Sequence, residues 1–225
     1  MNETVAAVRL VHIGAGFLAF VVAPAALVAA KGGVAHRRWG KLYFWSMAVV
    51  AVTAIVLAMW RPVEWLALVA VFSFYSAFSG YRALYRKHPY DGETATTWDW
   101  LAAIVTLSAS AALFALGVVR PNATWTRIST IAIVLGLLGM GLAAADFVRF
   151  TRPPRHRQAW WFAHMGGMLG SYVATVSAFS AVNFTFLPLA ARFLWPSVVG
   201  LPLIFIWVAY YRARFSRRAV AAVAA

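Results

Sequence analysis

The chain has 225 residues, 63% of them hydrophobic and only 12% charged, with a formal net charge of +14. Soluble domains are nearer half apolar and a quarter charged, so this composition excludes a soluble globule. The chain has no cysteine, which excludes disulfides, thiolate catalysis and covalently attached c-type haem. We attribute the positive charge to helix ends that contact anionic lipid headgroups, and we expect no nucleic acid partner.

Long runs without Asp, Glu, Lys or Arg recur along the sequence, for example at residues 10–30, 42–59, 100–119 and 128–145. About 20 apolar residues are needed to cross the hydrocarbon layer as a helix. The sequence therefore predicts an all-α integral membrane protein, a seven-helix bundle that forms one transmembrane domain over residues 1–225. The expected spans are about 8–30, 39–60, 64–85, 98–119, 127–148, 159–182 and 193–211.

The first two spans carry three of the polar side chains that we single out. His12 lies in the first span, His36 opens the second on the cytoplasmic side, and Tyr43 follows within it. Ionisable groups in membrane segments are costly, so each is a candidate for function. For His12 the alternative is a hydrogen bond in helix packing, and for His36 it is an interfacial position beside Arg37.

The third and fourth spans are joined by a polar, turn-rich connection around residues 88–92. Thr96 or Thr97 can cap the fourth helix there, with Asp99 in its positive first turn. No carboxylate falls at a predicted midplane, which counts against a proton-coupled pump.

The fifth span contains three glycines and ends near Asp146, which has Arg149 three residues on. A local ion pair is the simplest role for Asp146, and a place beside a histidine-bound cofactor is the alternative.

The sixth span places His164 just before a glycine-rich stretch that continues into Ser171 and Tyr172. Small residues four apart allow close helix packing in lipid. The alternative is that His164 faces a gap beside Gly167 and Ser171 that could take a flat cofactor.

Histidines at matched depth on different helices can hold haem iron or a divalent metal ion. With a rise of about 1.5 Å per residue, His12 and His164 differ in depth by roughly 20 Å, whereas His36 and His164 differ by roughly 8 Å. We therefore keep His12, His36 and His164 as candidate cofactor ligands, with His36 and His164 as the candidate metal pair. Candidate surrounding groups are Tyr43, Asp146, Ser171 and Tyr172.

Orientation follows from the distribution of the 20 Lys and Arg residues. Five of them, Arg9, Arg61, Arg120, Arg127 and Arg192, fall on the side of the N-terminus. The other 15 lie in the first, third and fifth connections and the C-terminal tail. Because positive loops stay in the cytoplasm, we expect the N-terminus outside, the C-terminus in the cytoplasm and the bacterial inner membrane as the location.

Two stretches resemble a bacterial family of predicted multi-span inner-membrane proteins of unknown function. The first runs from His12 through Gly16, Pro24 and Lys31-Gly32 to His36-Arg37 and Gly40 to Tyr43, similar to H-x-x-x-G followed by K-G-x-x-H-R-x-x-G-x-x-Y. The second runs from His164 through Met168 and Tyr172 to Ala178-Phe179 and Asn183. The resemblance implies a multi-span fold in the inner membrane and selects the same three histidines, without implying an activity.

Three hypotheses for function remain open from the sequence. The first is a redox or metal protein that holds haem b or a divalent metal ion. The second is a transporter or channel for a small solute. The lack of acidic residues at the midplane and of an internal repeat argues against it. The third is a non-catalytic accessory, sensor or assembly protein with a membrane protein partner or a second copy of the chain.

Overall fold

The computed structural model describes the backbone of residues 3–60 and 63–223 and the side chains of residues 3–60 and 63–217. Arg61, counted above on the less basic side, lies outside the described residues. Seven long helices account for most of the described chain: α1 (Glu3–Val28), α2 (Val34–Trp60), α3 (Glu64–Arg82), α4 (Thr97–Val119), α5 (Ala123–Thr151), α6 (Ala159–Asn183) and α7 (Leu189–Val223). Two short 3-10 turns, η1 (Ala83–Tyr85) and η2 (Pro89–Asp91), lie between α3 and α4.

All seven helices are long and apolar enough to cross a membrane, as the sequence predicts. In lipid the backbone must satisfy its hydrogen bonds within each segment, so a chain of apolar runs forms helices. Local signals define two of the starts. Thr96 and Asp99 form a capping box at α4, and the Asn122 side chain accepts a hydrogen bond from the Trp125 backbone at α5.

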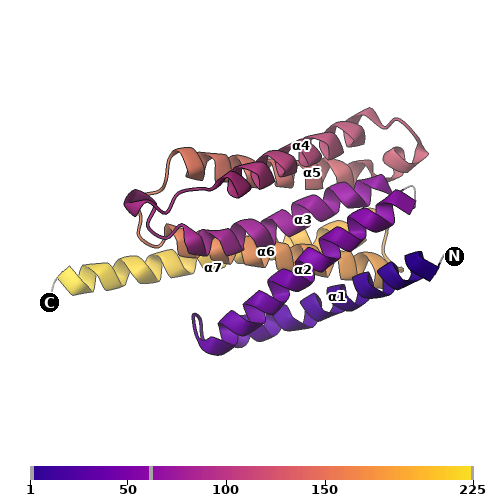
Figure 1. The fold of residues 1–225 in the computed structure, drawn as a ribbon. Helices are drawn as coiled ribbons and strands as arrows, with labels where there is room; N and C mark the ends of the chain where they lie inside the picture. The colour runs from indigo at the N-terminus through magenta and orange to yellow at the C-terminus, as the bar shows by residue number, and fades with distance from the viewer. Residues whose placement is uncertain (1–2, 61–62, 224–225) are drawn as a thin grey trace.

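The helices run roughly along one axis, with the two termini at opposite ends of the bundle (Figure 1). The hairpins α1–α2 and α4–α5 pack on either side of α3, and α3 also packs along α6. We call the end that holds the α1–α2, α3–α4 and α5–α6 connections and the last turns of α7 the basic end. Most Lys and Arg residues of the chain lie there.

The buried side chains of the bundle form two hydrophobic clusters, and its outer surface is also apolar. One cluster contains Trp65, Leu113 and Ile131, and the other contains Tyr43 and Met47. Large apolar side chains also cover the surface: Leu10, Phe17, Trp45, Ile104, Val182 and Phe205 are all exposed. So many exposed large apolar side chains fit contact with lipid, not with water.

The helix bounds lie within five residues of the predicted spans except at the end of α7; α1 and α2 each begin five residues earlier than expected. We expected that span at 193–211, whereas α7 begins at Leu189 and continues to Val223. The apolar run does end near Tyr211, but the following basic segment continues the same helix. Figure 1 shows this part of α7 extending past the other helices at the basic end.

Candidate functional site

A cavity of about 570 Å³ opens at the basic end, where the end of α1, the start of α2, the end of α3 and the start of α6 meet. Its walls are mostly apolar and aromatic, and include Leu27, Leu84, Trp161, Met165, Met168 and Trp207. Ligand pockets in proteins have volumes of about 300–1,000 Å³. The size and lining are therefore those of a site for a cofactor or an organic ligand.

His36 and His164 meet in this cavity, as the estimated depths of the two residues suggested. The ring centroids are 6.3 Å apart and the ring planes lie at 79°. His36 comes from the first turn of α2, and His164 from the second turn of α6. Both side chains are partly buried and both line the cavity.

The hydrogen bonds of the two rings determine which nitrogen is free. The Nδ1 atom of His36 lies 2.9 Å from the carbonyl oxygen of Ala26, and the Nδ1 atom of His164 lies 2.9 Å from that of Gly80. A carbonyl can only accept, so each Nδ1 carries the proton. In the neutral ring, Nε2 is then the unprotonated nitrogen that can bind a ligand.

Four cations with exposed side chains line the cavity, and no carboxylate lines it in the described part of the chain. They are Lys31, Arg37, Lys41 and Lys87. Lys31 donates to the carbonyl of Leu27, and Arg37 donates to that of Gly32 at 2.7 Å. The cavity therefore combines an apolar interior with a positive rim, which suits a ligand that is flat or apolar and carries negative charge at one end.

A group of buried hydroxyls lies behind the cavity wall at Tyr43. The buried Tyr43 hydroxyl donates to Ser171 Oγ at 2.8 Å and lies 3.1 Å from Thr175 Oγ1. Tyr172, one residue after Ser171, lines the cavity itself. The structure therefore brings two of the four expected surrounding residues, Tyr43 and Tyr172, to the cavity with the His36–His164 pair. Ser171 does not line the cavity and reaches it only through its hydrogen bond with Tyr43.

His12 lies apart from this site. It is on α1 some 16 residues before the helix ends at the basic end, and its Nδ1 atom is 2.9 Å from Thr53 Oγ1 of α2. This contact is the packing hydrogen bond considered above as the alternative. His12 does not line the cavity.

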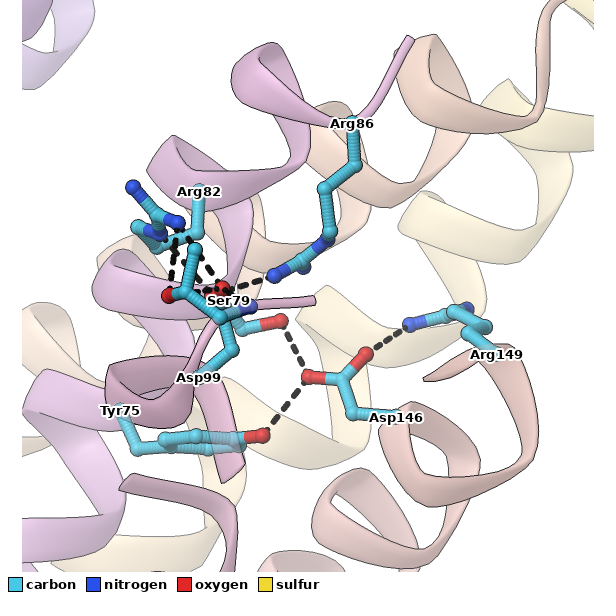
Figure 2. A network of polar contacts seen from close by, with 8 residues as sticks. Tyr75, Ser79, Arg82, Arg86, Asp99, Asp146 and Arg149 are labelled. Atoms are coloured by element: carbon cyan, nitrogen blue, oxygen red, sulfur yellow. Dashed lines mark hydrogen bonds and ion pairs between the residues drawn. The ribbon is translucent and has the colours of Figure 1, made fainter. Parts of the chain in front are cut away.

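Asp146 also belongs to a different group of side chains (Figure 2). Its carboxylate accepts hydrogen bonds from Tyr75 at 2.8 Å and from Ser79, and it pairs with Arg149 at 2.7 Å. The local ion pair expected from the spacing is thus present. Asp146 contacts neither histidine directly, although Ser79 precedes Gly80, whose carbonyl orients His164.

A second buried carboxylate is Asp99, which lies in the first turn of α4 as the sequence predicts. Its side chain is only 1% exposed and is held by Arg82 through two hydrogen bonds, at 2.9 and 2.8 Å. Arg86 pairs with the same carboxylate. The spacing of Arg82 and Arg86, one helical turn apart at the end of an apolar span, was the available signal for a shared acidic partner.

Close packing of α3 on α6 supports the position of His164. A Cβ atom on Gly167 would lie 2.6 Å from Gly80 Cα, and one on Gly80 would lie 2.8 Å from the Met168 nitrogen. Ser76 of α3 donates to the Gly167 carbonyl at 3.0 Å. The two glycines let the helix backbones approach until the Gly80 carbonyl can reach the His164 ring.

Among the described residues, no group of three or more His, Asp or Glu side chains could hold a metal ion. No protein-family model, curated protein or solved structure matches the chain. An assignment of function therefore depends on the geometry of the cavity and its two histidines.

Proposed function

We propose that this multi-pass membrane protein binds haem b in the cavity at its basic end, where His36 and His164 would hold the iron. The observation that carries the proposal is the pair of rings facing one cavity with each Nδ1 held by a backbone carbonyl. Histidine ligands of metals usually have their second nitrogen bound in this way, which fixes ring orientation and tautomer.

The separation of the rings supports this assignment. With nitrogen–metal distances of about 2 Å, two imidazoles on opposite sides of one ion have centroids roughly 6 Å apart. His36 and His164 are at 6.3 Å. Because a six-coordinate haem iron takes four nitrogens from the porphyrin, two protein ligands complete its coordination. A bare zinc ion needs three or four protein ligands, and the described residues offer two here.

The rest of the cavity supports haem over other organic ligands. The apolar and aromatic walls suit the porphyrin face, and Lys31, Arg37 and Lys41 at the mouth suit its two propionates. Haem iron would supply one-electron redox chemistry. The chain itself would hold the two rings, exclude water with apolar walls and neutralise the propionates.

The proposal includes a location. The basic end would lie in the cytoplasm of a bacterium, and the chain would span the inner membrane, because positive connections are retained on that side. The cavity mouth would then face the anionic headgroups and the cytoplasm, where a haem or an electron donor could approach it.

A reduced-minus-oxidised visible spectrum of the detergent-purified protein, expressed with added haem precursor, tests the proposal. We expect a sharp haem b band that is lost in both His36→Ala and His164→Ala. His12→Ala is the matched control, a membrane histidine outside the cavity, and should keep the band. A flat spectrum from folded wild-type protein would exclude haem, and a band that survives both cavity substitutions would exclude these ligands.

A further inference from the structure

A second, smaller pocket lies at the basic end, between the α3–α4 and α5–α6 connections. Its volume is about 70 Å³. At about 10–15 Å³ for each water-sized position, it has room for about five heavy atoms, the size of a phosphate group. Pro89, Pro153 and Pro154 form part of its wall, and the Tyr90 hydroxyl joins the two connections by donating to the Pro153 carbonyl at 2.6 Å.

Three cationic side chains, Arg86, Lys87 and Arg149, line this pocket. Arg86 has a side chain only 13% exposed, and it uses Nη1 to pair with Asp99. Arg149 likewise uses Nη1 to pair with Asp146. The Nε and Nη2 groups of both have no hydrogen-bond partner in the described part of the chain, so each guanidinium keeps donors for a ligand.

The charges around the pocket do not cancel. Arg82, Arg86, Lys87 and Arg149 face the carboxylates Asp99, Asp146 and Glu93, which leaves one positive charge in excess.

Among the residues that the structure describes, Glu93 is the one acid that lines the pocket. Its carboxylate accepts a hydrogen bond from the backbone N–H of His88 at 2.8 Å, and this bond lowers the pKa of Glu93. That carboxylate oxygen therefore accepts from the backbone of the α3–α4 connection and not from an arginine. The Nε and Nη2 groups of Arg86 and Arg149 remain available to a ligand.

We propose that this pocket binds a phosphate group through Arg86, Arg149 and Lys87. Guanidinium groups bind phosphate with paired, charge-assisted hydrogen bonds, and a partly buried cation with free donors gains most from such an anion. The phosphate would come either from an anionic lipid headgroup at the membrane surface or from free inorganic phosphate.

This site is separate from the proposed haem cavity, although Lys87 and Trp160 line both. The Lys87 Nζ atom lies 4.9 Å from the centre of the Trp160 ring, so this pair forms part of the wall between them. Phosphate binding does not require either histidine. Its test therefore succeeds or fails independently of the haem spectrum.

Calorimetric titration of the purified protein with inorganic phosphate, in a phosphate-free detergent, provides the test. A second arm uses soluble short-chain phosphatidylglycerol, with the matching phosphate-free diacylglycerol as its blank. We expect saturable binding in at least one arm, weakened about tenfold or more in Arg149→Gln. Arg155→Gln, on the same connection but outside the pocket, is the matched control and should bind like wild type.

Ala95→Leu supplies a second variant, because it fills the pocket without changing a charge and leaves the Asp146–Arg149 pair in place. It should also lose binding while its melting temperature stays near that of wild type. Binding of inorganic phosphate would identify a free oxyanion site, and binding of the lipid alone would identify a headgroup site. No binding in either arm, or unchanged binding in Arg149→Gln and Ala95→Leu, would overturn the proposal.

Discussion

A carboxylate buried in a membrane bundle is stable only when its charge and lone pairs are matched by neighbouring donors. Asp99 and Asp146 satisfy this condition in different ways. Asp146 pairs with Arg149 on its own helix, which the spacing of three residues predicts. Asp99 pairs with Arg82 and Arg86 across the α3–α4 connection, and only the folded chain brings those three residues together.

Replacing Asp99 with Asn should destabilise the protein by about 3 kcal/mol, because two partly buried arginines would lose their shared counter-charge. The free energy of unfolding in mixed detergent and dodecyl sulfate measures this loss. Asp91→Asn is the matched control, since Asp91 is 81% exposed, and it should change stability by less than about 0.5 kcal/mol. Equal effects of the two substitutions would show that the pairing of Asp99 contributes little.

Tyr43→Phe should cost about 1 kcal/mol, because it removes the hydroxyl that joins Ser171 and Thr175 beneath the cavity. The haem spectrum should remain, since Tyr43 is not an axial ligand in our proposal. Tyr210→Phe, at an exposed position on α7, should leave stability unchanged. A lost haem band in folded Tyr43→Phe protein would instead place this hydroxyl in contact with the cofactor.

At the scale of elements, the contact between α3 and α6 positions the site. Helices attract one another weakly in lipid, so small residues that allow close backbone approach have a large influence on packing. The glycine-rich stretch after His164 predicts such a contact. Its partner Gly80 on α3 is an isolated glycine in the sequence, and only the fold shows that it faces Gly167.

Gly167→Ala should separate α3 from α6 and destabilise the protein by about 1–3 kcal/mol, because the new methyl group would overlap the Gly80 backbone. It should also weaken the proposed binding of haem, since His164 is oriented by the Gly80 carbonyl. Gly166→Ala is the adjacent control, with nothing within 4 Å of the added atom. We expect it to be neutral or slightly stabilising, as alanine favours helix. Thermal unfolding and haem titration of both variants check this difference.

At the scale of the whole molecule, the α1–α2, α3–α4 and α5–α6 connections and the last turns of α7 share the basic end (Figure 1). This arrangement follows from seven crossings, and it gathers both pockets at the more positive end.

Because the chain has no cysteine, single cysteines can report which side of the membrane each end faces. An impermeant maleimide should label Ala123→Cys, at the less basic end, in intact cells with a permeable outer membrane. Thr94→Cys, at the basic end, should react only after the inner membrane is broken. The reverse pattern would place the basic end outside and contradict the predicted orientation.

The sequence by itself determined the membrane class, the number of spans and most of their bounds, because hydrocarbon thickness and backbone hydrogen bonding act on local composition. It also selected His36 and His164, since histidines are conspicuous in apolar helices. Only the tertiary structure placed those two rings 6.3 Å apart. It also showed that His12 forms a hydrogen bond with Thr53 and does not join the other two histidines. It alone paired Asp99 with Arg82 and Arg86. Such contacts depend on helix rotation and on packing between distant segments, which apolar composition leaves undetermined.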